Sequence, residues 1–219
     1  MYKSSYVQIP VNGVVLEGTL VIPKGAEGIV VFAHGSGSSR FSPRNRFVAE
    51  KLQANGLATL LMDLLTQAEE TVDQVTREFR FDIDRLSERL VDATRWIKRN
   101  EDTKAFNIGY FGSSTGAAAA LIAAATMPKD VGAVVSRGGR TDLAESYLSK
   151  VEAPTLLIVG SFDTLVIGIN RETMKQLKTE KKLEIVSGAS HLFEEPGTLE
   201  TVAGYAVEWF KKHLGHPVR

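Results

Sequence analysis

Cysteine is absent from this sequence of 219 residues, and its absence removes three kinds of chemistry together. Without thiols there are no disulfides, no thiolate metal sites and no cysteine nucleophile. An excess of one charge is missing as well, because 26 Lys and Arg residues balance 26 Asp and Glu residues. With no net charge to attract a polyanion, we expect no nucleic-acid partner and no association with an anionic membrane.

Long apolar segments are also missing. No apolar run approaches the roughly 18 residues of a membrane span, and the first ten residues, MYKSSYVQIP, lack the apolar region of a signal peptide. We therefore expect a cytoplasmic protein. Repeats, linkers and low-complexity tracts are absent too, and 43% hydrophobic residues suffice for one core. We predict a single domain over residues 1–219, as a monomer or a homodimer.

Apolar segments of two kinds predict the strands. Two alternating segments, SSYVQIPVN and GVVLEGTLVIP, meet at Asn12-Gly13, a dipeptide that favours a tight turn, and predict an antiparallel hairpin. Later runs rich in Val, Ile and Leu are typical of strands buried on both faces. These runs are GIVVFAHG, LATLLMD, FNIGYFG, VGAVVSRGG, PTLLIVG and KLEIV.

Helical signals lie between these runs. A helix is predicted to start at Ser42-Pro43 and to end at Asn55-Gly56. Two further helices are indicated by apolar stripes at helical spacing, with charged residues such as Arg89 on the opposite face of the first. The stripes are Ile83, Leu86, Leu90, Ala93 and Ile97, and then Leu199, Val202, Ala206 and Phe210, stopped by Gly215 and Pro217. The alternation predicts an α/β fold, with a mainly parallel sheet and helices on both faces.

A G-x-S-x-G pattern lies directly between a predicted strand and a predicted helix, at Gly112, Ser114 and Gly116. So sharp a turn predicts strained backbone at Ser114, and side chains at the two glycines would collide with neighbouring elements. The Ser114 hydroxyl is then raised above the sheet edge at the positive end of the helix 115–127, while Ser113 points away. Ser114 is therefore the candidate nucleophile.

An activating base and its partner are expected at the carboxyl ends of other strands. His191 is the candidate base, since its intrinsic pKa suits proton transfer at neutral pH, and Asp163 is the candidate to orient its ring. Two alternatives stand beside this hypothesis: Asp163 caps the helix that follows it, or Asp63, at an analogous strand end, is the acid. His34 is expected to support its loop and not to act as the base.

Stabilisation of a tetrahedral oxyanion requires two preorganised N–H donors, and losing one costs roughly 3–4 kcal/mol. We expect one donor from Thr115, directly after the nucleophile. The second is expected from the loop HGSGSS, with Ser36 favoured and Gly37 as the alternative.

Two arginines that follow strand ends, Arg40 and Arg137, are candidates to hold a substrate carboxylate. The alternative for both is a structural bond to loop carbonyls or acids. The acidic stretch QAEETVDQVTREFRFD is interpreted either as a mobile flap over the pocket or as a surface loop and helix start. No long lid insertion is evident, so we expect an open cleft for modest acyl substrates.

The segments VVFAHGSGSS, GYFGSSTGAAAAL, APTLLIVGSFD and GASHLFEEPG occur in one order along the chain. In these segments the chain resembles small α/β-hydrolases, in particular the dienelactone-hydrolase-like serine hydrolases. The resemblance implies an α/β-hydrolase fold without a large lid, and ester or related acyl hydrolysis by a serine-histidine-aspartate triad without cofactor or metal.

Two departures limit what the resemblance carries over. Dienelactone hydrolases proper use a cysteine nucleophile, so their named substrate is not assigned here. Many relatives also have a proline two residues after the acid, where this chain has Leu165. We predict a carboxylesterase-like serine hydrolase acting on small carboxylic esters. A thioesterase, amidase or acyltransferase with the same triad, and a catalytically idle binding module, are the alternatives.

Overall fold

The chain begins with the predicted hairpin. In the computed structural model, which describes residues 2–215, β1 (Tyr2–Val11) pairs antiparallel with β2 (Val14–Pro23). Asn12 and Gly13 have φ angles of 36° and 83°, and positive φ at both central residues is typical of a type I′ turn. The predicted turn and antiparallel hairpin at Asn12-Gly13 are confirmed.

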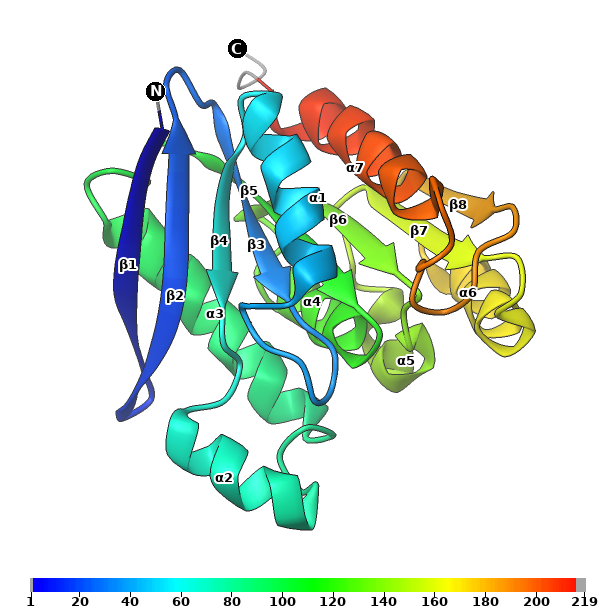
Figure 1. Cartoon of the computed structure of the whole chain (residues 1–219), viewed down its shortest axis with the longest axis horizontal. Helices are drawn as coiled ribbons and strands as arrows, with labels where there is room; N and C mark the ends of the chain where they lie inside the picture. Colours follow the sequence, from blue (N-terminus) through cyan, green and yellow to red (C-terminus); the bar gives the residue numbers. More distant parts are fainter. Residues whose placement is uncertain (1, 216–219) are drawn as a thin grey trace.

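The later apolar runs all form strands of the same sheet, as predicted (Figure 1). The eight strands lie in the order β1-β2-β4-β3-β5-β6-β7-β8. Strands β3 to β8 run parallel to one another, and β2 joins β4 antiparallel. Their bounds are β3 (Gly28–Ala33), β4 (Ala58–Met62), β5 (Asn107–Ser113), β6 (Val131–Arg137), β7 (Thr155–Gly160) and β8 (Lys181–Val186).

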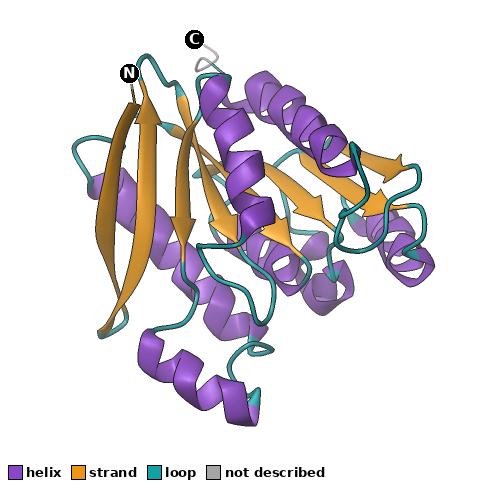
Figure 2. Ribbon diagram, in the orientation of Figure 1, coloured by secondary structure: helices purple, strands orange, loops and turns teal. Residues whose placement is uncertain are grey.

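Helices cover both faces of this sheet (Figure 2). Helices α1 (Pro43–Ala54) and α7 (Thr198–Leu214) pack together on one face, in front in Figure 1. The other face carries α3 (Ile83–Arg99) and α4 (Thr115–Thr126), followed by a short 3₁₀ turn (Thr141–Ala144) and α5 (Glu145–Leu148). Helix α6 (Thr164–Gln176) packs beside β7 and β8, and α2 (Gln67–Thr76) lies beyond the carboxyl ends of β3 and β4.

The helix ends follow the predicted signals. The Ser42 hydroxyl accepts a hydrogen bond from the Asn45 N–H at 3.3 Å, which caps α1, and Gly56 follows its end with a φ of 82°. Helix α7 ends before Gly215, while Pro217 lies outside the described residues. The caps fix where each helix starts and therefore which side chains reach the sheet.

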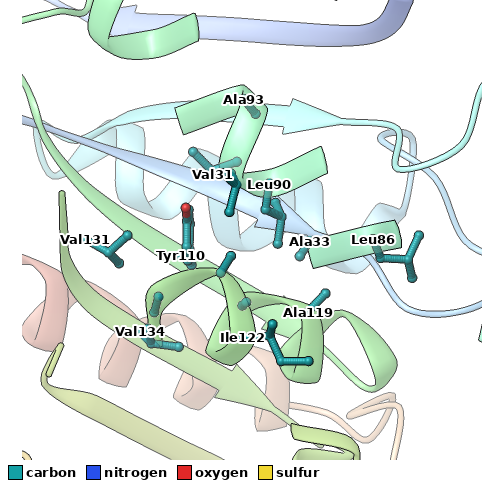
Figure 3. Close-up of a cluster of buried hydrophobic side chains, with 14 of the residues drawn as sticks. Val31, Ala33, Leu86, Leu90, Ala93, Tyr110, Ala119, Ile122, Val131 and Val134 are labelled. Carbon is teal, nitrogen blue, oxygen red and sulfur yellow. The ribbon is translucent and has the colours of Figure 1, made fainter. Parts of the chain in front are cut away.

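The predicted stripe of α3 packs into the larger core cluster, with Ile83 only partly buried at its start (Figure 3). Leu86, Leu90 and Ala93 lie among strand and helix residues that include Tyr110, whose hydroxyl is 2.5 Å from that of Thr94. Every residue of α4 from Thr115 to Ala124 is buried between the sheet and α3. Because alanine side chains are small, the helix packs closely against both. This packing holds the start of α4, and so the turn before it, in a fixed position.

One residue of α3 departs from prediction. Arg89 was expected on the solvent face of the helix, but it is buried. Its guanidinium donates to the Leu64 carbonyl and to the Glu69 carboxylate, each at 2.5 Å. Helical spacing did not reveal this burial because the charge is compensated by α2 and the loop before it, which lie distant in the sequence.

Candidate active site

The loops after β3, β5, β7 and β8 meet at the carboxyl edge of the sheet, where α/β folds bind ligands. The last two approach closely at Gly160, where an added Cβ would lie 2.4 Å from the Ala189 carbonyl oxygen. Such a distance leaves no room for a side chain. The glycine therefore allows the segment carrying Asp163 to lie against the segment carrying His191.

Ser114 occupies the sharp turn between β5 and α4. Its backbone angles, φ 51° and ψ −119°, are strained for a non-glycine residue and persist only where the surroundings enforce them. The Ser114 N–H donates to the Arg137 carbonyl in β6, and the Ser114 carbonyl accepts from the Arg140 N–H, each at 3.1 Å. These two bonds hold the strained residue from both sides, and the predicted strain is confirmed.

The two glycines of the motif are required by close contacts. A Cβ on Gly112 would lie 2.4 Å from the Ala117 Cα, and one on Gly116 would lie 2.2 Å from the Ala33 carbonyl oxygen. Both distances are too short for a real side chain, so the predicted collisions are confirmed. The neighbouring serine is bonded elsewhere: the Ser113 hydroxyl donates to the Asn45 side chain in α1 at 3.0 Å.

His191 and Asp163 are in direct contact. The Nδ1 of His191 lies 2.5 Å from Oδ2 of Asp163. Asp163 occupies the position before α6 but makes no side-chain capping bond, so its carboxylate serves the histidine and not the helix. Because a carboxylate accepts at Nδ1, the proton of neutral His191 belongs on Nδ1, which leaves Nε2 as an acceptor.

The two alternative residues at strand ends, His34 and Asp63, are already bonded to other groups of the chain. The Leu64 N–H donates to His34 Nε2 at 3.0 Å, so the ring proton lies on Nδ1, which donates to the Gly35 carbonyl at 3.0 Å. Burial lowers the pKa of His34 and keeps the ring neutral. Asp63 accepts from the Arg40 N–H at 2.7 Å and also pairs with the Arg40 guanidinium. His34 therefore supports its loop, as expected.

The predicted oxyanion donors lie close together, Thr115 at the start of α4 and Ser36 in the loop after β3. The Thr115 N–H, at the first helical position, has no acceptor within the helix. The Ser36 N–H donates to the Thr115 hydroxyl at 2.9 Å. Sequence reasoning did not foresee this bond, which occupies the favoured second donor. Gly37, the alternative, lines a different cavity together with Arg40 and Asp63.

A cavity of about 250 Å³ contains Ser114 and His191 in its wall, together with Ser36. Among the described residues no hydrogen bond joins the Ser114 and His191 side chains, and such bonds are often long before a substrate is bound. Arg44 and Arg137 line the same cavity, from α1 and from the end of β6. The predicted nucleophile and the predicted base therefore line one small cavity, while Asp163 lies behind His191.

The two candidate arginines have different surroundings. Arg40 pairs with Asp63 and, at 2.7 Å, with Glu17, which corrects the substrate-binding hypothesis in favour of its structural alternative. Arg137 is only 7% exposed, and its buried Nε and Nη1 have no hydrogen-bond partner within residues 2–215. Burial, followed by the nearby charge of Arg44, lowers the pKa of Arg137 to about 10, so that Arg137 is still charged at neutral pH.

A larger cavity of about 730 Å³ adjoins the first and shares Ser38 and Ser42 with it. The acidic stretch, interpreted as a flap or as a loop with a helix start, forms α2 on one wall of this cavity. A reciprocal capping box starts the helix: the Glu69 N–H donates to the Thr66 hydroxyl, and the Thr66 N–H donates to the Glu69 carboxylate. The spacing Thr66-x-x-Glu69 was the signal that the prediction overlooked.

The architecture and the strand-turn-helix at Ser114 define an α/β-hydrolase. The chain belongs to the dienelactone hydrolase family, whose model matches residues 16–213. A dienelactone hydrolase from Anabaena variabilis ATCC 29413 is 60% identical, with a TM-score of 0.96 over 97% of this chain and 99% of that chain. Family and structure together confirm the resemblance and the predicted fold class.

More distant structures share the fold. Est1E from Butyrivibrio proteoclasticus is 17% identical, with a TM-score of 0.81 over 95% of this chain and 98% of that one. An esterase from Pyrococcus furiosus is 21% identical, also with a TM-score of 0.81, over 98% of this chain and 92% of that one. At these identities the two neighbours show the same fold as this chain.

Two curated relatives have a different name. Both are called "Putative phosphoribosyl transferase", come from strains of Mycobacterium tuberculosis, and are 53% identical over 215 residues. The match covers 98% of this chain but 48% of each relative, so the chain spans about half the length of these proteins. Within residues 2–215, no helix combines the length and the apolar character needed to cross a bilayer.

Proposed function

We propose that this protein is a serine hydrolase that cleaves small carboxylic esters through an acyl-enzyme intermediate. One observation carries the proposal: His191, with Nδ1 held by Asp163 at 2.5 Å, lines the same cavity as Ser114. A serine hydroxyl becomes a useful nucleophile only when a nearby base removes its proton. The strained turn exposes such a hydroxyl, and the oriented imidazole is the base beside it.

In the proposed reaction, Ser114 Oγ attacks the ester carbonyl while His191 Nε2 accepts the hydroxyl proton. Asp163 stabilises the resulting imidazolium and does not itself take the proton. The Thr115 N–H donates to the developing oxyanion at the positive end of α4. Collapse of the intermediate breaks the bond to the leaving alkoxide, which receives the proton from His191. Water then releases the acyl group by the same steps. The three side chains supply this chemistry without a metal or cofactor.

The experiment is the hydrolysis of p-nitrophenyl acetate and butyrate by the whole chain. Ser114→Ala should lower turnover by about a millionfold, because the covalent step is lost. Ser113→Ala is the matched control, since that hydroxyl is bonded to Asn45, and it should change turnover less than tenfold. Wild-type rates in Ser114→Ala would refute the proposal. A fluorophosphonate probe should label wild-type protein and fail to label Ser114→Ala.

The alternatives differ in the leaving group or in the absence of chemistry. A thioesterase or amidase would prefer the matched thioester or anilide, and an acyltransferase would prefer an added alcohol to water as acceptor. An idle binding module would resist the fluorophosphonate probe. Phosphoribosyl transfer is the function that the curated relatives' name suggests. The chain matches only 48% of those proteins, and the contacts around Ser114 favour acyl chemistry for this half.

A further inference from the structure

The position of His191 depends on the loop that carries it. Asp163 holds Nδ1 of the ring at 2.5 Å, whereas no hydrogen bond joins the ring to Ser114 among residues 2–215. The ring also lies against the Gly138 backbone, where an added Cβ would be 3.3 Å from His191 Cε1. A misplacement of about 1 Å between reacting groups can cost on the order of 100-fold in rate. The contacts that fix the backbone of this loop therefore decide how well the base meets the hydroxyl.

The loop from Ser190 to Glu195 is closed on itself by a side chain. The Glu195 carboxylate accepts from the Ser190 N–H at 3.0 Å, directly before His191. Inside this loop, the Ser190 carbonyl accepts from the Phe193 N–H at 3.3 Å. Hydrogen bonding to Ser190 lowers the pKa of Glu195, so the carboxylate is charged at neutral pH, and charged acceptors form the stronger bonds. The histidine therefore lies within a closed loop, and Glu195 supplies the closing bond.

Phe193 shows that the loop is held against its own backbone preference. Its φ angle is 55°, which is unusual for a bulky residue. Its side chain is buried in the core cluster that also contains Val48 of α1 and Val202 of α7. Such a conformation persists only where the surroundings enforce it. The buried ring anchors the loop after His191, and the Glu195 carboxylate anchors it before His191.

Glu195 is itself fixed by the start of α7. Its carbonyl accepts from the Thr198 N–H at 3.1 Å and from the Thr198 hydroxyl at 2.7 Å. Thr198 is buried, and α7 packs against α1 and the sheet. The carboxylate therefore connects the loop of His191 to a helix that the core holds in place. The adjacent carboxylate differs, since Glu194 is exposed and pairs with Arg44 at 3.1 Å.

We propose that Glu195 is a positioning residue for His191: its carboxylate holds the Ser190 N–H and thereby places Nε2 of His191 to receive the Ser114 proton. The inference rests on the proposed hydrolase function and adds to it a residue that acts through the base. Among the described residues, Glu195 does not line the cavity that Ser114 and His191 share, so its effect on the reaction is indirect. Loss of the bond should therefore lower turnover and leave substrate binding unchanged.

The kinetic test compares Glu195→Ala with Glu195→Gln in the hydrolysis of p-nitrophenyl butyrate. Glu195→Ala removes the acceptor, and kcat should fall about 10- to 100-fold with KM unchanged. Glu195→Gln keeps a carbonyl oxygen that can accept from the Ser190 N–H, so it should retain most of the rate. Glu200→Ala is the matched control, because it removes an exposed carboxylate from the first turn of α7. It should leave kcat unchanged.

A signature independent of turnover is the proton on Nδ1 of His191. Its short bond to Asp163 should give a low-field proton resonance in NMR spectra of the wild type. The resonance should persist in Glu195→Gln and in Glu200→Ala. It should broaden or move to higher field in Glu195→Ala, because the ring is then held less firmly against the carboxylate. This pattern in a protein that hydrolyses no ester would sink the proposed function and leave Glu195 as the residue that positions the ring.

Urea unfolding separates positioning from simple support of the fold. A structural role alone would lower the free energy of unfolding of Glu195→Ala, while kcat of the folded variant and the His191 resonance would keep their wild-type values. That result would overturn the proposal and leave the hydrolase function intact. A Glu195→Gln variant as slow as Glu195→Ala would also overturn it, because the acceptor would then not be the feature that matters.

Discussion

Two histidine–aspartate regions lie at the same edge of the sheet. His34 and Asp63 follow the neighbouring strands β3 and β4, and His191 and Asp163 follow β8 and β7. In the first region both ring nitrogens and the carboxylate are bonded to the backbone or to Arg40. In the second region, the Asp163 carboxylate is bonded to Nδ1 of His191, and Nε2 of His191 has no hydrogen-bond partner among the described residues. One region is internally satisfied, whereas the other keeps an acceptor available.

Arg40 and Arg137 differ in the same way, in whether the chain itself satisfies their hydrogen-bonding groups. Arg40 is bonded to two carboxylates of its own chain, and Arg137 is buried beside Ser114 with two nitrogens that have no partner in the described part of the chain. All six side chains follow strands at one edge, so position in the fold does not distinguish them. What distinguishes them is the hydrogen-bonding capacity that the chain leaves unused, because a buried polar group normally finds a partner. Unused capacity beside a cavity is therefore the better indicator of function.

The largest expected effect comes from exchanging each aspartate for asparagine. Asp163→Asn should lower kcat for p-nitrophenyl butyrate by about 10⁴-fold, because the amide favours the wrong tautomer of His191. Asp63→Asn should change kcat less than tenfold but lower the free energy of unfolding by about 1–3 kcal/mol, because the Arg40 guanidinium loses a charged partner. Initial rates and urea unfolding on both variants measure the two effects. The reverse pattern would make Asp63 the functional acid.

A smaller effect is expected at His34, and it depends on pH. In His34→Leu the Leu64 N–H loses its acceptor, which should lower the free energy of unfolding by about 1–3 kcal/mol at pH 8. Burial lowers the folded-state pKa of His34, so below about pH 6.5 the unfolded chain binds the additional proton and the wild type loses stability. His34→Leu lacks this loss, so the stability difference should shrink from pH 6.5 to 5. A difference that grows instead would mean that folded His34 is protonated.

Local patterns were sufficient to predict most of the fold. Apolar runs, the Asn12-Gly13 turn and the Ser42-Pro43 cap are signals within a few residues, and each formed the predicted element. The sequence analysis did not decide whether the segment of α2 is a flap or a surface loop with a helix start, because the capping box at Thr66 and Glu69 was overlooked among the charged residues. The burial of Arg89 was missed for another reason, since its partners come from a different part of the chain.

The candidate site was predictable to the extent that each residue follows a strand. The sequence indicated Ser114, Asp163 and His191, and the structure brings the last two into contact. It did not distinguish Arg40 from Arg137, because both follow strand ends and only packing shows which has carboxylates nearby. The bond from the Ser36 N–H to Thr115 was equally hidden, since it joins a loop to a helix residue 79 positions further along the chain.

The smallest effect should come from that bond. Thr115→Val removes the hydroxyl that accepts from the Ser36 N–H and ties the loop after β3 to the start of α4, and we expect kcat to fall about tenfold or less, with KM unchanged. Thr115→Ser keeps the hydroxyl and should keep the rate, which makes it the matched control. Steady-state kinetics with p-nitrophenyl acetate measure both. A higher kcat in Thr115→Val would mean that the hydroxyl competes with the oxyanion for the Ser36 amide. The Ser36 N–H would then be a donor that the wild-type protein uses internally, as it uses the ring nitrogens of His34.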